Sequence, residues 1–295
     1  MVYRSFNEEM KSRFGCKIYK LALSGGMTCP TRDGTLGTRG CIFCSMRGSG
    51  DFAIGRCESI SKQIEKAKAV VSKKAKDSKY IAYFQDFTNT YAPADYLRKL
   101  FFEAIEQDDI VALSIGTRPD CLPDDVMELL SELNKIKPVF VELGLQTIHP
   151  QTAEYIRRGY DLPVFDKAVE DLLKNNIEVV VHVILGLPGE TKEMMLDTVR
   201  HVANCGAKGI KLQLLHVLEG TDLANEYRAG KFKTLEMDEY IDILIDCIKT
   251  LPPDMVVHRI TGDGAKRDLI APLWSADKKR VLNEINRRLR QLQFD

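Results

Sequence analysis

The chain has 295 residues, with 42 Lys and Arg, 42 Asp and Glu and a formal net charge of zero at pH 7. This length suits one α/β barrel or two smaller domains with a sizeable core. The charge balance indicates neither a nucleic acid nor a membrane surface as a partner, and eight cysteines are too few for a disulfide scaffold. No apolar run approaches the ~20 residues that cross a bilayer, and the first 20 residues lack the apolar stretch of a signal peptide. We therefore expect a cytoplasmic protein without membrane contact, in which cysteines point to metal binding or catalysis.

The predicted elements alternate between strands and helices. After an N-terminal extension over residues 1–16, apolar runs predict strands at 18–23, 79–84, 109–116, 138–145, 177–185 and 209–215. Helical patterns cover residues 59–75, 94–106, 123–134, 150–158, 163–175 and 191–204. Six strand–helix alternations with short connections favour parallel βαβ units. The periodicity alone leaves open whether the sheet is doubly wound or closes toward a barrel.

The last quarter of the chain continues in the same α/β style. It contains a predicted helix near 236–250, a short strand at 255–260, a turn at 261–264 and a last helix at 276–292. No repeat, low-complexity segment or linker separates it from the rest. We expect a core at 1–216, including the short N-terminal extension, with a C-terminal α/β extension at 217–295 packed on it.

Three cysteines lie on one loop directly after the first predicted strand: Cys29, Cys41 and Cys44. Thiolates are soft ligands that favour zinc or iron–sulfur clusters. A closed structural zinc site takes four protein ligands, and no second Cys-x2-Cys or His-x3-His pair follows. Three cysteines instead suit a [4Fe-4S] cluster whose fourth iron stays open for a small molecule. A zinc-clipped module without catalytic activity is the alternative.

The loop resembles the signature of the radical S-adenosylmethionine (radical SAM) superfamily, Cys-x3-Cys-x-aromatic-Cys, with Phe43 in the aromatic position. Its first gap is eleven residues instead of three. The longer pattern Ser-Gly-Gly-Met-Thr-Cys-Pro-Thr-Arg-Asp-Gly-Thr-x-Gly-Thr-x-Gly-Cys-Ile-Phe-Cys is similar to one bacterial and archaeal family related to the Elp3 and coproporphyrinogen dehydrogenase branches. The resemblance implies a partial (β/α)6 TIM-like barrel that is open on one side, a [4Fe-4S] cluster on the three cysteines, and SAM on the open iron.

The resemblance also implies the reaction class. One electron reaches the cluster from a donor such as flavodoxin or ferredoxin and cleaves SAM into methionine and a 5′-deoxyadenosyl radical, which abstracts hydrogen from the substrate. The cofactors supply this chemistry, while the protein positions and shields the radical.

Functional groups of barrel folds cluster at the C-terminal ends of the strands. The second predicted strand leads to Gln85 and Asn89, whose polar side chains suit the methionyl end of SAM. After the third strand, Arg118 can hold a carboxylate bidentately, and Asp120 can orient it. Cys121 follows at once and is the one candidate for a catalytic side chain. An ordinary polar loop and a structural Arg–Asp pair are the competing interpretations.

The fourth predicted strand contains Glu142 and Gln146, in a pattern similar to the Glu-x-Gly-x-Gln-Ser motif of the Elp3 and coproporphyrinogen dehydrogenase relatives. In those relatives the glutamine and an arginine twelve residues later contact SAM, which corresponds here to Gln146 and Arg158. Because an unpaired buried carboxylate is costly, we expect Glu142 to face the barrel mouth, with Arg118 as a candidate partner.

The fifth predicted strand ends in Gly186 and Leu187, similar to the superfamily region whose backbone meets the adenine of SAM. His182, in the same strand, is expected to be an ordinary core residue. The sixth strand places Lys211 and Gln213 at alternate positions, followed by His216, where they can point into the barrel.

Similarity to Elp3, which acts on wobble uridines of tRNA, implies an RNA base as the substrate. The predicted last helix adds six Lys and Arg against two acidic residues, and such a helix can contact phosphates. A radical enzyme acting on a small metabolite or a peptide is the alternative within the enzyme class.

Overall fold

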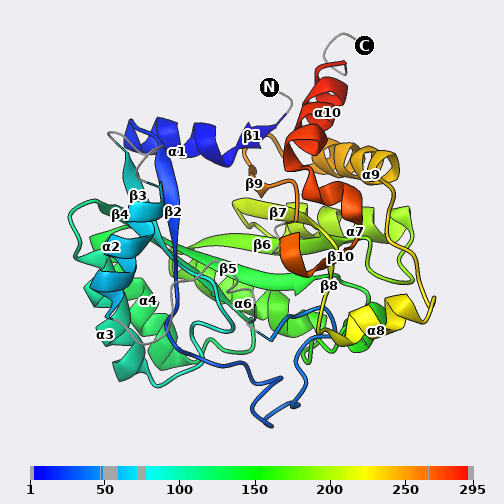
Figure 1. The fold of residues 1–295 in the computed structure, drawn as a ribbon. Helices are drawn as coiled ribbons and strands as arrows, with labels where there is room; N and C mark the ends of the chain where they lie inside the picture. The colour runs from blue at the N-terminus through cyan, green and yellow to red at the C-terminus, as the bar shows by residue number, and fades with distance from the viewer. Residues whose placement is uncertain are drawn as a thin grey trace.

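The computed structural model describes residues 3–46, 48, 59–71, 78–262, 264 and 266–291. Its centre is a parallel eight-stranded sheet curled into a half-barrel, with the strand order β1-β9-β7-β6-β5-β4-β3-β2. Figure 1 shows the helices arranged along the outside of this sheet, with the long loop after β2 at the opposite end from both termini. In the part of the chain that is described, no helix is long and apolar enough to cross a membrane.

The strands of the main sheet are β1 Arg4–Ser5, β2 Ile18–Leu23, β3 Lys79–Phe84, β4 Ile110–Thr117, β5 Val139–Gln146, β6 Glu178–Leu185, β7 Gly209–Leu214 and β9 Val256–Arg259. A small antiparallel ribbon consists of β8 Val217–Leu218 and β10 Leu269–Ala271. The helices are α1 Phe6–Phe14, α2 Ile60–Val71, α3 Ala94–Ile105, α4 Asp124–Ile136, α5 Pro150–Tyr155, α6 Leu162–Lys174, α7 Lys192–Asn204, α8 Asp222–Arg228, α9 Met237–Thr250 and α10 Lys278–Gln291, with short 3-10 turns η2 Lys266–Asp268 and η3 Leu273–Ala276.

The predicted partial barrel is confirmed. All six predicted strands are present as β2 to β7, with each end within two residues of its predicted position, and they pair in parallel. The predicted helix at 59–75 begins as α2, while its residues 72–75 lie outside the described part of the chain. The strand expected at 255–260 forms as β9, but it extends the main sheet between β7 and β1.

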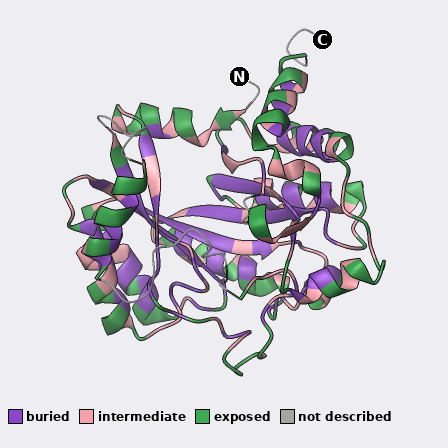
Figure 2. Ribbon diagram, viewed as in Figure 1, coloured by how far each residue is buried: buried purple, intermediate pink, exposed green. Residues whose placement is uncertain are grey.

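The outer face of the sheet carries the main hydrophobic core. Side chains such as Leu21, Phe84, Val141 and Val181 are almost fully buried there together with the apolar stripes of the covering helices. Figure 2 shows the sheet largely buried and the exposed residues gathered on the outer sides of the helices. Since these strands are covered on both faces, they read as nearly continuous apolar runs, which is why the sequence predicted them well.

The inner face of the sheet is layered, because successive residues of a strand alternate between its two faces. The layer near the strands' N-terminal ends is apolar and is closed by Met10 of α1; it contains Ile18, Ile81, Ala112, Phe140 and Val180. Two residues further along, the layer is polar and contains Lys20, Tyr83, Ser114, Glu142, His182 and Lys211. The polar layer forms the floor of the barrel's C-terminal mouth.

Candidate active site

The loop after β2 brings its three cysteines to one cavity at the C-terminal mouth of the barrel. Cys29, Cys41 and Cys44 all line this space, which has a volume of about 130 Å³ and which we call the cysteine cavity. Burial, together with the neighbouring Cys44 thiol, raises the pKa of Cys41 to about 12. The thiolate form of Cys41 therefore needs a nearby cation, such as a cluster iron, to stabilise it.

Arg32 holds the two ends of the cysteine loop together. Its Nη2 donates hydrogen bonds to the carbonyl oxygens of Cys44 and Ser45, at 3.0 Å and 2.7 Å. Its side chain crosses Gly40, where an added Cβ would stand 2.7 Å from the Arg32 Nε and the backbone φ is +71°. The long gap between Cys29 and Cys41 thus contains the arginine that fastens the Cys-x2-Cys turn, a role that we did not predict from the sequence.

Gln146 lies between the cysteine cavity and its neighbour described below. It follows a register shift between β5 and β6, and its φ of +68° is unusual for a residue with a side chain. Its Oε1 is buried without a hydrogen-bond partner. Strained residues and orphaned buried acceptors are typical of ligand sites, so Gln146 is placed to accept a hydrogen bond from a bound molecule.

The two predicted arginines line the cysteine cavity but are engaged by the protein itself. Arg118 forms a bidentate pair with Asp120, at 2.9 Å and 2.6 Å, as the sequence suggested. It also donates to the carbonyl oxygen of Arg158 at 2.7 Å. Among the described residues, the Arg158 guanidinium donates to three backbone carbonyl groups, those of Leu145, Thr147 and Tyr160.

Glu142 lines the cysteine cavity and is almost completely buried, and the expectation that Arg118 pairs with it is wrong. Its carboxylate lies 2.5 Å from Lys20 Nζ and 2.7 Å from His182 Nε2, and it also pairs with Lys211 and accepts from Ser114. The reason is the register of the sheet, which sets Glu142 in the polar layer, while Arg118 follows the end of β4. Although burial raises the pKa of Glu142, Lys20 and Lys211 hold it well below its usual range.

Of the other residues predicted to contact SAM, one lines the cysteine cavity and three do not. Gln85 lines the cysteine cavity. Asn89 is fully buried outside it, and its Nδ2 donates to the carbonyl oxygen of Gly116 at 2.9 Å. Gly186 and Leu187 also lie outside the lining, with Leu187 packed in an apolar cluster.

Cys121 does not face the cysteine cavity. It is buried beside Asp120, and it lines a separate depression formed by residues 90–93 and 119–123. Burial raises the pKa of its thiol to about 12. The thiol is therefore uncharged near neutral pH.

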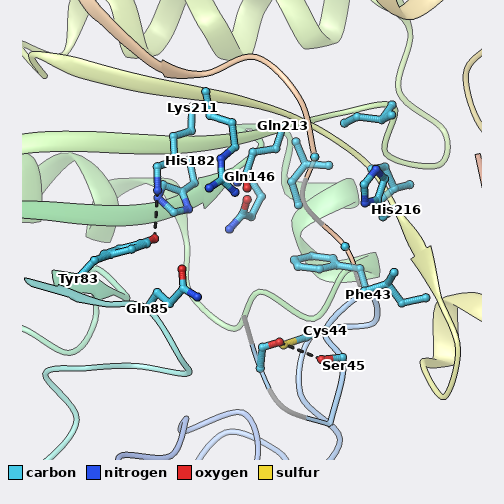
Figure 3. A pocket seen from close by; sticks show the side chains of 18 residues that line it. Phe43, Cys44, Ser45, Tyr83, Gln85, Gln146, His182, Lys211, Gln213 and His216 are labelled. Carbon is cyan, nitrogen blue, oxygen red and sulfur yellow. Dashed lines mark hydrogen bonds between the residues drawn. The ribbon is translucent and has the colours of Figure 1, made fainter. Parts of the chain in front are cut away.

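A second cavity of about 180 Å³ adjoins the first, and we call it the Lys211 cavity. Figure 3 shows Lys211, His182, Tyr83 and Gln85 around one side of it and Phe43, Cys44 and Ser45 toward the other. Gln213 lines it too, two residues after Lys211 in β7, and so does His216, which follows the strand. The two cavities adjoin each other, and both are lined by Phe43, Cys44, Gly48, Tyr83, Gln85, Gln146 and His182.

His182 is more than the core residue that the sequence suggested, because it faces both cavities and bonds Glu142. Burial lowers its pKa to about 4, so its imidazole is neutral near pH 7. Lys20, Tyr83 and Arg259 were also missed as members of this region. The available signal was a single polar residue inside an otherwise apolar strand, such as Lys20 in β2 or His182 in β6.

The cysteine cavity fits a cluster better than a single ion. Within the described ranges, no group of three or more His, Cys, Asp or Glu side chains forms a site for a metal ion. A [4Fe-4S] cluster makes a different demand, since each of three cysteines binds a different iron. The shared cavity of the three thiols and the orphaned Gln146 Oε1 suit such a cluster with a small polar ligand on its open iron.

Family models cover most of the chain. The model described as the radical SAM superfamily matches residues 35–202, and the radical SAM C-terminal domain matches residues 207–291. The first match includes Cys41 and Cys44 but begins after Cys29, in the middle of the long gap. The second match includes β7, β9 and α9, so it overlaps the half-barrel.

Similar proteins extend this result. YtqA of Bacillus subtilis is 47% identical over 97% of this chain and 89% of its own length. The tRNA uridine(34) acetyltransferase of Methanocaldococcus jannaschii is 30% identical over 52% of this chain and 28% of its own length. A truncated Elp3 from Methanocaldococcus infernus has the same fold, with a TM-score of 0.66, 18% identity, and coverage of 92% of this chain and 63% of that one.

The cysteine loop, the half-barrel and the family match agree on one family and its cofactors, a [4Fe-4S] cluster and SAM. The chain belongs to the radical SAM superfamily and is a radical SAM enzyme.

Proposed function

We propose that this enzyme holds its [4Fe-4S] cluster on Cys29, Cys41 and Cys44 and acts on the wobble uridine of tRNA. The observation that carries the proposal is the pair of adjoining cavities at the barrel mouth. The three cysteines line one of them, and amide, imidazole and ammonium groups line the other, the Lys211 cavity. Two adjoining cavities suit SAM and a second polar molecule side by side.

The bound cluster and SAM supply one-electron chemistry that generates a radical for hydrogen abstraction. The protein's own residues bind, orient and enclose the reactants. Gln146 offers its unpartnered Oε1 to a donor group of SAM, and Gln85 faces the same space. Arg118 lines the same cavity, and its pair with Asp120 fixes the guanidinium beside the place where we propose the carboxylate of SAM. The turn at Gly186 and Leu187 remains a proposed SAM contact on the strength of the family pattern. Asn89 remains one only by its position after β3, where the family's usual Gly-Gly-Glu is absent.

The tRNA substrate is supported by similarity and by the chemistry of the cavity. The partial match to a tRNA uridine(34) acetyltransferase and the fold shared with archaeal Elp3 point to this class of RNA. Gln85, Gln146 and Gln213 present amide groups to the cavity, and amides can pair with the donor and acceptor edge of a base that is turned out of its strand.

The surface of α10 supports RNA binding less than its sequence suggested. In α10, Arg287 and Arg288 are paired with carboxylates, those of Glu284, Asp238 and Asp242. The helix therefore offers less positive charge to phosphates than its count of basic residues implies. We further propose a cytoplasmic location and a flavodoxin or ferredoxin as the electron donor.

Anaerobic reconstitution tests the enzyme class and the ligand set. With SAM and a chemical reductant, the native protein should release 5′-deoxyadenosine and show the visible absorbance of an iron–sulfur cluster. Cys41→Ala should lose both signals. Cys205→Ala, at a half-buried cysteine outside both cavities, should keep them. A Cys41→Ala protein with native absorbance and turnover would contradict the assigned ligands.

The substrate is tested separately by nucleoside mass spectrometry of tRNA from a strain that lacks the protein. We expect an altered set of wobble-uridine nucleosides, restored by the native gene and not by the Cys41→Ala gene. An unchanged set would remove the RNA substrate and leave a small metabolite or a peptide as the alternative.

A further inference from the structure

Arg32 belongs to the cysteine loop and lines the cysteine cavity together with Cys29, Cys41 and Cys44. Its hydrogen bonds to the carbonyl oxygens of Cys44 and Ser45 hold the guanidinium against the Cys-x2-Cys turn. Both bonds come from one nitrogen, Nη2, and they give the charged group a fixed position beside the three cysteines.

Among the described residues, the positive charge of Arg32 is not paired with a carboxylate. Its guanidinium contacts the two carbonyl groups and the Phe87 ring, whose centroid lies 5.6 Å from the Arg32 Cζ. The neighbouring Asp33 is exposed and accepts a hydrogen bond from a backbone N–H of the loop at 3.0 Å. Arg118, on the same cavity, differs because it is paired with Asp120. Arg32 therefore places an unpaired positive charge on the wall of the cysteine cavity.

This charge acts on one of the three thiols. Burial raises the pKa of Cys41 to about 12, and the positive charges of Arg118 and Arg32 oppose that shift. Salt screens the interactions of buried groups less than those of groups at an open surface. The field of Arg32 therefore extends to a group that the same cysteines bind.

We propose that Arg32 raises the reduction potential of the [4Fe-4S] cluster and so eases its one-electron reduction. The electron that enters the cluster adds a negative charge to a group already bound by three thiolates. A fixed positive charge nearby stabilises the reduced form more than the oxidised form, since net charge is one of the factors that set the potential of a cluster. This inference rests on the proposed function, because it takes Cys29, Cys41 and Cys44 as the ligands.

The competing interpretation is that Arg32 only fastens the loop through its hydrogen bonds. In that case its substitution lowers the amount of cluster that the protein takes up or the stability of the loop. The clusters that do form then keep their native potential. Cluster content and reduction potential are measured separately, so the two interpretations can be distinguished.

The test compares Arg32→Gln with Arg32→Lys. Glutamine keeps N–H donors and removes the charge, whereas lysine keeps both. Potentials are measured by redox titration of the reconstituted cluster, followed by electron paramagnetic resonance, without SAM or tRNA. At a fixed solution potential, Arg32→Gln should lower the ratio of reduced to oxidised cluster at least about tenfold, which corresponds to about 59 mV for one electron. Arg32→Lys should stay within about threefold of the native ratio.

Arg39→Gln is the matched control on the same loop. The Arg39 side chain is 74% exposed, lies 3.7 Å from Asp222 and does not belong to the lining of the cysteine cavity. Removal of this charge should leave the reduction potential unchanged. A drop equal to that of Arg32→Gln would contradict a specific role for Arg32.

A second pair of variants keeps Arg32 and its hydrogen bonds, in case Arg32→Gln takes up no cluster. Phe87 lines the same cavity and has a φ of +53°, a conformation that Asp and Asn tolerate better than most residues. Phe87→Asp adds a carboxylate beside the guanidinium, and Phe87→Asn has the same shape without charge. The potential of Phe87→Asp should lie below that of Phe87→Asn. Equal potentials would contradict the proposal.

A native potential in a cluster-loaded Arg32→Gln protein would overturn the proposal, and so would an equal drop in Arg32→Lys. The ligand set is tested independently by the absorbance of Cys41→Ala, and the substrate by the wobble-nucleoside experiment. An unchanged potential together with the loss of absorbance in Cys41→Ala would remove the role of Arg32 and leave the proposed ligands in place.

Discussion

The guanidinium of Arg158 forms hydrogen bonds with the backbone at the end of β5, where Gln146 has a positive φ. It donates to the carbonyl oxygens on both sides of Gln146, those of Leu145 at 3.2 Å and Thr147 at 2.5 Å. It also donates twice to the carbonyl oxygen of Tyr160, at 3.0 Å and 2.9 Å. These bonds hold the backbone where Gln146 adopts its φ of +68°. The spacing of twelve residues between Gln146 and Arg158 thus has a structural basis in addition to any contact with SAM.

This geometry predicts a stability effect for Arg158→Lys. A lysine keeps the charge and has three N–H donors, but they sit on one nitrogen and cannot span acceptors that Arg158 reaches from Nε, Nη1 and Nη2. Each buried acceptor left without a partner costs about 1–3 kcal/mol. We expect the free energy of unfolding to fall by about 2–4 kcal/mol, measured by urea denaturation without SAM. The SAM affinity should fall as well, because Gln146 loses its support.

Arg157→Lys is the adjacent control. Arg157 forms an ion pair with Asp222 at 2.6 Å, and its side chain is 26% exposed. A lysine can replace that single contact, so the cost should stay below about 1 kcal/mol. If Arg158→Lys lowered the affinity for SAM without lowering stability, Arg158 would be a direct ligand and not a support for Gln146.

Residues whose roles are set locally could be predicted from the sequence, and residues paired across the barrel could not. Cys29, Cys41 and Cys44 share a loop, so their common cavity follows from chain proximity. The partners of Glu142 lie on β2, β6 and β7, and they meet only because the parallel register brings them to one layer. A single sequence does not specify that register, which is why we expected Arg118 instead of Lys20 as the partner.

At the scale of elements, Gly262 and Gly264, which follow β9, pack closely against the His216 imidazole. An added Cβ on Gly264 would stand 2.8 Å from the His216 Nδ1 and 2.9 Å from a methyl group of Leu218. An added Cβ on Gly262 would stand 2.7 Å from the same imidazole and 2.9 Å from the carbonyl oxygen of Leu214. These glycines let the chain cross His216 closely and form part of the wall of the Lys211 cavity.

Gly264→Ala should therefore destabilise the protein, because its new methyl group would clash with the His216 imidazole. A second substitution that removes the imidazole should relieve this clash. We expect a cost of about 1–3 kcal/mol in the free energy of unfolding. In a His216→Ala background the same substitution should cost less than half as much, because the methyl group of Leu218 can move aside. Denaturant unfolding of the four proteins of this double-mutant cycle gives the coupling.

Gly262→Ala provides the contrast within the same segment. The His216→Ala background should relieve it only in part, because the carbonyl group of Leu214 belongs to the backbone of the sheet and cannot rotate away. Equal relief at Gly262 and Gly264 would show that the imidazole alone limits the approach of this segment.

Long elements were predictable because their patterns extend over many residues. The apolar strands β2 to β7 and helices such as α7, whose Thr191 cap accepts from the backbone N–H of Met194, formed as expected. The missed strands β1, β8 and β10 are only two or three residues long, too short to carry a pattern. β9 was predicted as a strand, but its place beside β7 depends on contacts between distant parts of the chain.

At the scale of the whole molecule, the C-terminal segment is interleaved with the barrel. β9 lies between β7 and β1, and α9 packs against α7. Apolar side chains of α9 and α10, including Tyr240, Leu244 and Ile285, belong to the same hydrophobic core as the barrel helices. The expected extension at 217–295 therefore contributes a strand, a helix layer and a wall of the Lys211 cavity.

This arrangement predicts that the fragment 1–216 does not fold as the native barrel. Without residues 217–295, the edge of β7 loses its paired strand and the outer face of α7 loses its apolar cover, so backbone groups and buried side chains become exposed. We expect circular dichroism to show reduced structure and urea unfolding to lack a single cooperative transition. The fragment 1–277 is the matched control, because it keeps β9 and α9 and removes only α10.

The fragment 1–277 should unfold cooperatively with a reduced free energy of unfolding. The loss should be about 1.5–3 kcal/mol for each of the apolar side chains of α10 that are buried against the core, Val281, Ile285 and Leu289. A fragment 1–216 with a cooperative transition close to that of the full chain would mean that the barrel is complete at residue 216. In that case β9 would be a dispensable edge strand, and the Lys211 cavity could be removed without unfolding the cysteine cavity.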